Sequence, residues 1–379
     1  MAPEGNVTAV SSFLPSSDSK KYNRIKLGTG IVSSLLSFSL MVYLVATGSS
    51  RMLADWCSTT VRHPYGRLLI FSALVGCIQM ILTLPCSWYS GFLVEHRFGL
   101  SNQTLARWAW EKIKETIVAG PVVAGVLMVL YYCLTTWGSY WWLPLSIALT
   151  LLSVVFARLA PILVLPLFYK LTPLTEGPLR SRIVDLCSRS GVYVKGIFTF
   201  NLSKNTRKAN AAFTGIGKAK RIILGDTLVN AFTEEEVATV FAHELGHYRH
   251  HHIAIGMSLG VVSTFFGLYL TSLAYAWSVN FLGFTTLYDI AALPLLAVWL
   301  TFYGLLTNPL DNILSRRHER QADTYAVRVT RNGAAFISAL QKLATMNLAD
   351  PEPHPLVEFL FHSHPSIGKR IRSIESIRV

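Results

Sequence analysis

The chain has 379 residues, of which 51% are hydrophobic and only 15% are charged, and its formal net charge is +13. Two or three soluble domains would fit this length, but the composition argues against a soluble protein. A positive charge of this size would suit a nucleic-acid-binding protein, but the distribution of the basic residues excludes that class.

Five long stretches contain no Asp, Glu, Lys or Arg, and each is long enough to cross a bilayer, which takes about 20 apolar residues. They cover residues 27–47, 68–94, 116–157, 253–288 and 290–310. The third is about twice the length of one span and is interrupted at residues 135–140, which we interpret as a tight loop between two helices. The sequence therefore predicts six transmembrane helices.

The basic residues divide the loops between these helices into two classes. Thirty of the 34 Lys and Arg residues lie before residue 27, in residues 95–115, in residues 166–252 or after residue 310. Six spans place these four segments on one side of the membrane, and the positive-inside rule makes that side cytosolic. We therefore expect a multi-pass protein of the lipid bilayer whose termini and whose segment 166–252 are cytosolic. A bacterial inner membrane and the endoplasmic reticulum are not distinguishable.

The predicted organisation has five segments. These are a disordered cytosolic tail (1–26), spans one to four (27–165), a polar segment (166–252), spans five and six (253–310) and a C-terminal polar segment (311–379). We call the two polar segments the catalytic segments, because they contain the candidate catalytic residues described below. Residues 104–114 are amphipathic and predict a helix along the inner membrane surface. In the catalytic segments we expect helices over 179–190, 312–329 and 334–346, a strand over 192–201 and a hairpin formed by 210–214 and 221–224.

The segment 233–252 carries the strongest chemical signal. Thr233 and Glu236 have the spacing of a capping box, and the following apolar residues predict a helix past His247, running directly into span five. His243 and His247 stand at i and i+4, so their imidazoles share one face and can bind a single ion. Glu244 can reach a water on that ion as a general base. Two ordinary surface histidines are the alternative, because short motifs also match by chance.

A zinc ion held by two histidines needs a third protein ligand and leaves its fourth position for water. Glu319 and Asp323 also stand at i and i+4, in a segment predicted to be helical. One carboxylate can bind the metal while the other accepts the free N–H of a ligating histidine. A solvated charged face is the alternative reading of this pair.

Several short motifs, spread over roughly residues 68–375, resemble the CAAX prenyl protease type 1 family of integral-membrane zinc metallopeptidases, within the gluzincins. They include Leu84-Pro85-x-Ser87-x-Tyr89, Phe98-Gly99, Pro166-Leu167-Phe168, Asn210-Ala211 with Phe213, residues 243–247, residues 315–323 and Ser363-His364-Pro365. The resemblance implies that His243, His247 and Glu319 hold one Zn²⁺ per chain. It also implies that Glu244 is catalytic and that Asp323 holds a ligating histidine without binding the metal itself.

The resemblance also implies a fold and two further functional positions. The fold is an α-helical barrel that encloses a chamber, with a small α+β zincin-like catalytic domain at its cytosolic end. Asn210 would open a strand, continued by Ala211, Ala212 and Phe213, whose edge can pair with a peptide; a turn residue is the alternative. His364 would donate to the tetrahedral intermediate, with a structural role as the alternative.

Other polar residues near these motifs have simpler interpretations. We expect Arg370 to be a structural ion-pair partner. We expect His250, His251 and His252 to form a polar collar where the catalytic helix enters the bilayer. Eukaryotic members of the family have seven spans, and we expect this chain to lack the first of them, which would reshape the chamber wall.

The sequence thus predicts a membrane-embedded zinc endopeptidase that acts near the C-terminus of CAAX-type prenylated proteins, or on other hydrophobic membrane-associated peptides. A quality-control metalloprotease of the bacterial heat-shock type is the alternative within the same chemistry. A transporter, a channel or an inactive zinc-binding scaffold is the alternative from other classes. The spans carry few ionisable residues, which argues against transport.

Overall fold

The computed structural model describes residues 17–214 and 221–377. Six helices in this part of the chain are long and apolar enough to cross a membrane, as predicted. They are α1 (Ser17–Ala46), α3 (Pro64–Trp88), α5 (Leu105–Trp137), α6 (Trp142–Leu159), α11 (His252–Phe281) and α12 (Leu293–Thr330). Short π-helical turns extend α3 into α4 (Val94–Arg97) and α6 into α7 (Leu165–Phe168).

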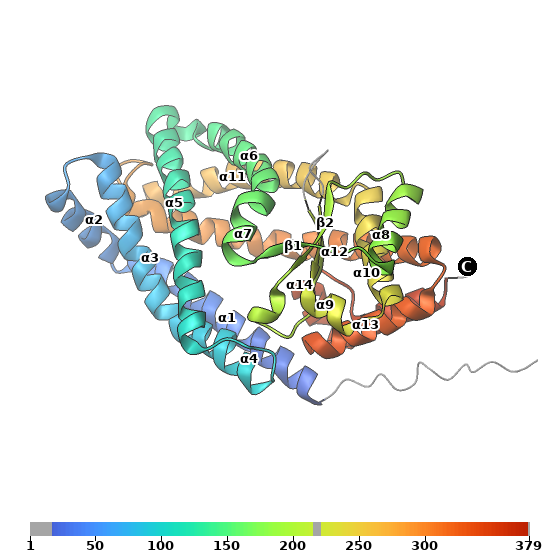
Figure 1. Ribbon diagram of the computed structural model, residues 1–379. Coiled ribbons are helices and arrows are strands. Elements are labelled where there is room, and N and C mark those ends of the chain that lie inside the picture. Colours follow the sequence, from blue (N-terminus) through green and yellow to red (C-terminus); the bar gives the residue numbers. More distant parts are fainter. Residues whose placement is uncertain (1–16, 215–220, 378–379) are drawn as a thin grey trace, which may run out of the picture.

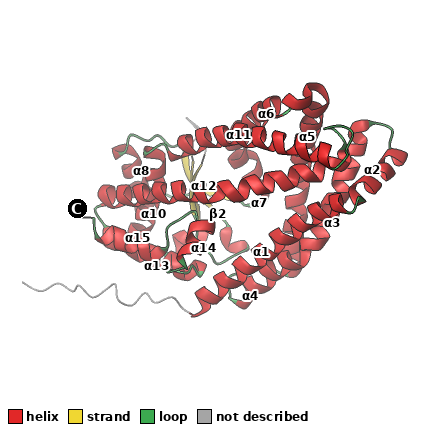
Figure 2. Ribbon diagram, turned by 180° about the vertical axis from the view of Figure 1, so that it is seen from behind, coloured by secondary structure: helices red, strands yellow, loops and turns green. Residues whose placement is uncertain are grey.

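The six helices form a closed ring. Helix α1 contacts α3 and α12, α5 contacts α3 and α6, and α11 contacts α6 and α12. Figures 1 and 2 show these helices from opposite sides, extending away from the end of the molecule that holds the sheet and the C-terminus. Few residues of their most apolar windows are buried within the protein, as expected of side chains that face lipid. The predicted helical barrel is confirmed.

The limits of several predicted elements differ from the structure. Helix α5 is continuous from Leu105, so residues 104–114 extend span three and do not form a separate surface helix. Helix α12 likewise joins span six to the predicted helix over 312–329. Pro309 lies within α12 and does not end it, although proline commonly kinks or breaks a helix. A helix, α2 (Ser49–Thr60), fills the first loop. Residues 17–26, predicted as disordered, begin α1; residues 1–16 lie outside the described part.

The described residues of the two predicted catalytic segments (166–252 and 311–379) come together as one unit, which we call the catalytic half. It contains a four-stranded mixed sheet in the order β1-β2-β4-β3. Its strands are β1 (Leu171–Pro173), β2 (Gly196–Phe200), β3 (Ala211–Thr214) and β4 (Arg221–Gly225). Strand β2 pairs with β1 antiparallel and with β4 parallel, and β3 pairs with β4 antiparallel. The predicted hairpin is therefore present, and its turn, residues 215–220, lies outside the described residues. Strand β3 lies at an edge of the sheet.

One hydrophobic core joins the sheet to the C-terminal end of α12 and to five further helices. These are α8 (Pro178–Arg189), α9 (Asp226–Ala231), α10 (Glu234–Arg249), α13 (Gly333–Asn347) and α15 (Ile367–Glu375). Helix α14 (Pro355–Phe361) contacts α12 and contributes no residue to this core. Helix α10 is central, since it contacts α8, α12, α13 and β3. Phe241 on α10 and Phe336 on α13 are each 1% exposed, and burying such a side chain contributes about 1.5–3 kcal/mol.

The catalytic helix and span five are separate helices, contrary to the prediction. Helix α10 ends at Arg249 and α11 begins at His252. Between them His251 has a φ of 57°, in the left-handed region that interrupts an α-helix. The break places His252 in a position that helical spacing from His247 does not predict.

Candidate active site

A capping box fixes the start of α10 and also ties this helix to α13. The Thr233 hydroxyl accepts the Glu236 N–H at 3.3 Å, and the Glu236 carboxylate accepts the Thr233 N–H at 2.8 Å. The same carboxylate accepts Ser338 Oγ at 2.6 Å and Lys342 Nζ at 2.7 Å. Burial alone would raise the pKa of Glu236, but these bonds outweigh it and lower the pKa below its usual range.

The two motif histidines meet Glu319 where α10 packs on α12. His243 Nε2 lies 3.2 Å from His247 Nε2 and 3.4 Å from Glu319 Oε2, and His247 Nε2 lies 3.1 Å from Glu319 Oε1. Zinc ligands at about 2.0–2.2 Å in a tetrahedron stand roughly 3.3 Å apart, so this spacing fits one ion. Glu319 Oε2 is buried without a hydrogen-bond partner, as expected of an oxygen that binds a cation.

Asp323 and Arg370 hold the first histidine. Asp323 Oδ1 lies 2.8 Å from His243 Nδ1, which leaves Nε2 directed at the ligand cluster. Arg370 donates to both Asp323 oxygens, at 2.6 and 2.9 Å, as the predicted structural ion-pair partner. Burial lowers the pKa of His243, but the neighbouring carboxylates of Asp323 and Glu319 outweigh it and raise this pKa to about 9. The surroundings of His243 therefore favour positive charge.

His252 holds the second histidine, a role that the predicted polar collar does not include. Its Nδ1 lies 3.1 Å from His247 Nδ1, and its Nε2 lies 2.9 Å from Gln321 Oε1. If His247 Nδ1–H donates to His252, then His252 Nε2–H donates to Gln321, and Nε2 of His247 is left for the metal. No sequence signal indicated this, because the left-handed His251 intervenes.

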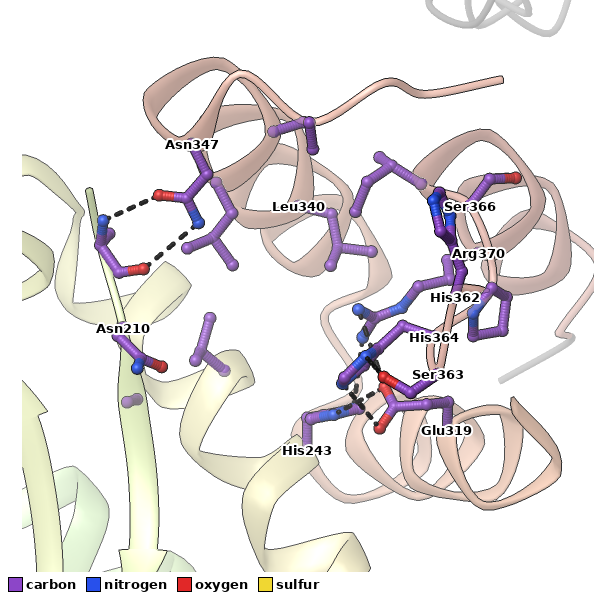
Figure 3. A pocket seen from close by; sticks show the side chains of 18 of the residues that line it. Asn210, His243, Glu319, Leu340, Asn347, His362, Ser363, His364, Ser366 and Arg370 are labelled. Atoms are coloured by element: carbon purple, nitrogen blue, oxygen red, sulfur yellow. Dashed lines mark hydrogen bonds and ion pairs between the residues drawn. The ribbon is translucent and has the colours of Figure 1, made fainter. Parts of the chain in front are cut away.

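A cavity of about 530 Å³ opens beside the ligand cluster, and Glu244, Asn210 and His364 all line it. Burial raises the pKa of Glu244 above its usual range. His364 Nε2 lies 3.4 Å from Glu319 Oε1, and His364 Nδ1 lies 2.9 Å from Ser363 Oγ. Figure 3 shows His364 next to His243 and Glu319, and Asn210 across the cavity from them.

The loop that carries His364 is attached to α12. Arg316 Nη1 donates to the carbonyls of Glu358 and His362, at 2.9 and 2.6 Å. The same helix therefore provides Glu319 and holds the His364 loop. The sequence gives no sign of this attachment, because Arg316 is more than 40 positions from Glu358 and His362.

Strand β3 borders the cavity on the other side. Ala209, Asn210 and Ala211 line the cavity, and Asn210 is exposed. The Asn210 carbonyl accepts the Gly225 N–H of β4 at 2.9 Å, so Asn210 continues the ladder rather than forming a turn. Ala212 pairs with Ile223 of β4, and the side chain of Phe213 lies outside the described part of the structure.

Comparisons with known proteins agree on one family. The family model described as "Peptidase family M48" matches residues 173–378, and "CAAX prenyl protease N-terminal, five membrane helices" matches residues 16–170. The CAAX prenyl protease 1 homolog of Arabidopsis thaliana is 32% identical, over 81% of this chain and 73% of that protein. The uncharacterized metalloprotease YhfN of Bacillus subtilis is 28% identical, over 99% and 89% of the two chains.

A solved structure has the same fold over nearly the whole chain. It is the crystal structure of S. mikatae Ste24p, which aligns with a TM-score of 0.86 at 25% sequence identity. The alignment covers 97% of this chain and 93% of that one. The similarity therefore includes both the ring of membrane helices and the catalytic half.

Proposed function

The chain belongs to peptidase family M48 and, within it, to the CAAX prenyl protease 1 family, and from this premise we propose that it cleaves membrane-associated proteins near their C-termini. Family membership and the His-His-Glu cluster make it a zinc metallopeptidase. A transporter or channel is thereby set aside. The observation that carries the proposal is the convergence of His243, His247 and Glu319, at 3.1–3.4 Å from one another, beside Glu244 in one cavity.

In this proposal His243, His247 and Glu319 hold one zinc ion per chain. When bound, zinc supplies a Lewis acid that polarises the scissile carbonyl and acidifies a water molecule. The Glu244 carboxylate accepts a proton from the attacking water and later delivers it to the leaving amine nitrogen. The raised pKa of Glu244 suits this role, because it makes the carboxylate a stronger base than an exposed one.

His364 and Asn210 face the reacting peptide bond from opposite sides in this mechanism. His364 is attached through its loop to the helix of Glu319, and its side chain is 61% exposed, so it is available to a substrate. Its Nε2–H donates to the oxygen that gains charge as water attacks the carbonyl. The Asn210 carboxamide, across the cavity, holds the substrate backbone.

The substrate binds as an added strand. Strand β3 lies at the sheet edge that borders the cavity, and in the described residues no further strand pairs with its outer side. An extended peptide that pairs with Ala211 on this edge brings one of its peptide bonds between β3 and the zinc ligands. The backbone hydrogen bonds provide affinity without selecting a sequence, so the selection for particular proteins must come from other parts of the molecule.

We propose that the substrates are CAAX-type prenylated proteins. The relatives named CAAX prenyl protease 1 and the ring of apolar helices next to the catalytic half support this class, because a prenyl chain needs an apolar environment. Both termini and the active site face the cytosol in this proposal, where prenylated C-termini are exposed. The orientation rests on the positive-inside distribution of Lys and Arg.

The substrate class is tested with purified protein and a peptide pair that differs only in farnesylation of its cysteine. We expect mass spectrometry to find a C-terminal fragment released from the farnesylated peptide much faster than from the unmodified one. Equal rates for the two peptides, or faster cleavage of unprenylated hydrophobic membrane peptides, would replace the CAAX substrate with the quality-control alternative. The zinc chemistry would be retained in that case.

A further inference from the structure

The side chain of Asn347 forms a pair of hydrogen bonds with one residue next to the substrate strand. The Ala209 N–H donates to Asn347 Oδ1 at 3.0 Å, and Asn347 Nδ2 donates to the Ala209 carbonyl at 3.3 Å. Ala209 lies two residues before β3, and Asn347 is the last residue of α13. Both residues line the catalytic cavity, and Figure 3 shows their two bonds on the side of Asn210 away from His243.

The direction of the neighbouring backbone groups makes this pair informative. In an antiparallel ladder successive residues direct their N–H and C=O groups alternately to one neighbour and the other. The Asn210 carbonyl accepts the Gly225 N–H of β4, so Asn210 faces β4. Ala209 and Ala211 therefore face the outer edge, toward the cavity. The Asn347 carboxamide occupies the position on this edge that a bound peptide would take opposite Ala209.

The Asn347 carboxamide bonds both the N–H and the C=O of Ala209, but it has no chain direction, so it fills this edge position against a peptide of either direction. An antiparallel peptide, paired as β4 is on the other side of β3, would bond both the N–H and the C=O of Ala211. Since β3 runs from Ala211 to Thr214, the carboxyl end of that peptide points toward Ala209 and Asn347.

We propose that Asn347 is a specificity-determining residue that limits how far a substrate can extend on the carboxyl side of the cleaved bond. Pairing with the edge must end before Ala209, because Asn347 already satisfies its N–H and C=O. The enzyme therefore favours peptide bonds with a short segment after them. This inference rests on the proposed function, in which the substrate pairs with β3.

The surroundings of Asn347 keep this limit in place. Asn23 of α1 donates to the carbonyl of Leu348 at 2.6 Å, directly after Asn347. Lys208 directly precedes Ala209. Its Nζ lies 2.9 Å from the Glu95 carboxylate of α4 and donates to Tyr22 Oη of α1 at 2.9 Å. Both members of the Asn347–Ala209 pair are thus attached to membrane helices or their extensions, so a substrate cannot easily move them aside.

The test uses one peptide substrate extended stepwise at its carboxyl end, and a matched series extended at its amino end. The parent protein is compared with Asn347→Ala, and kcat/KM is measured with mass spectrometric identification of the cleaved bond. We expect carboxyl extensions to lower kcat/KM in the parent. In Asn347→Ala the longest peptides should gain about tenfold relative to the shortest, because two backbone groups of Ala209 become available. Amino extensions should behave alike in both proteins.

Two further variants separate this role from support of the fold. Asn332→Ala removes the cap at the other end of α13, where the Asn332 side chain accepts the Ala335 N–H at 3.0 Å, and it leaves the edge unchanged. We expect it to lower thermal stability without changing the length preference. Asn347→Asp keeps the size of the side chain and can accept the Ala209 N–H but cannot donate to its carbonyl. It should relax the preference in the same direction, by less than Asn347→Ala.

An unchanged length preference in both Asn347 variants would overturn the inference. So would a relaxation seen with amino extensions, since the peptide would then run in the opposite direction. In either case the parent still cleaves peptides, so the proposed function stands. A parent protein that binds zinc and cleaves neither peptide series would overturn the proposed function and this inference with it.

Discussion

A Cβ atom added to Gly246 would lie 2.9 Å from the Cα of Ala322 and 3.1 Å from its carbonyl oxygen. The glycine inside the His243–His247 motif therefore permits the close approach of α10 and α12. Because His243 and His247 lie on α10 and Glu319 lies on α12, this approach sets the distance between the two histidines and the carboxylate. The motif thus specifies helix packing as well as two metal ligands.

Gly246→Ala should separate the two helices and weaken zinc binding. The obstruction is backbone, which cannot rotate away as a flexible side chain could, and overpacking of this kind costs about 1–3 kcal/mol. We expect less than one zinc per chain by elemental analysis, together with a lower melting temperature. Gly256→Ala on α11 is the matched control, because its added Cβ meets no atom within 4 Å. Full zinc occupancy in Gly246→Ala would mean that α10 and α12 tolerate the separation.

Asp323→Ala should weaken zinc binding although Asp323 is not itself a ligand. The substitution frees His243 Nδ1 and leaves the Arg370 guanidinium without its carboxylate partner. Loss of such a partner lowers metal affinity by roughly 10–100-fold. Competition with a chromogenic chelator measures this, with the exposed Asp185→Ala on α8 as the control. An affinity equal to that of the parent would remove Asp323 from the support of His243.

Glu236→Gln should lower stability in a pH-dependent way. Glutamine can keep the capping bond to Thr233 but loses the charge that pairs with Lys342. The pKa of Glu236 is lowered in the folded state, so its contribution is present above the unfolded pKa of about 4.3 and is lost as pH falls through the folded pKa. Since Lys342 is partly exposed, we expect about 1 kcal/mol.

Thermal unfolding in detergent tests this pH dependence. The melting temperature of Glu236→Gln should lie below that of the parent at neutral pH, and the gap should close in acid. Glu234→Gln, at an exposed position in the same helical turn, should match the parent throughout. A gap that stays constant across the pH range would attribute the loss to packing rather than to charge.

Both termini should lie in the cytosol. Single cysteines at Ser17, Ser139 and Ser376 of a cysteine-depleted variant can be labelled in intact cells with an impermeant maleimide. We expect label only at Ser139, which lies between α5 and α6. Label at Ser17 or Ser376 instead would reverse the orientation and remove prenylated cytosolic proteins as substrates.

Much of the fold could be predicted because apolar length and helical spacing are local properties. The six spans, helices α8 and α13, and the hairpin of β3 and β4 all follow from such patterns. Limits were missed where no residue stops a helix, so that α5 and α12 extend through segments predicted as separate. The break at His251 was missed for the opposite reason, since a non-glycine residue in the left-handed region has no reliable sequence signal.

The site was predictable to the extent that its residues share a helix. The i, i+4 spacings bring His243 next to His247, and Glu319 near Asp323. The contact of Asp323 with His243, and of His252 with His247, depends on how different helices pack. The pairing of Asn347 with Ala209 joins residues 138 positions apart, and a lone asparagine at a helix end gives no sign of it.

The central claim is that this chain is a zinc endopeptidase with Glu244 as its general base. The most direct measurement compares release of the C-terminal fragment from the farnesylated peptide by the parent and by Glu244→Gln, with the zinc content of both proteins determined in parallel. Glutamine keeps the shape of the side chain but cannot accept the proton, so we expect full zinc content and a kcat lower by roughly 10²–10⁴-fold. Activity within a few-fold of the parent, at equal zinc content, would contradict the account.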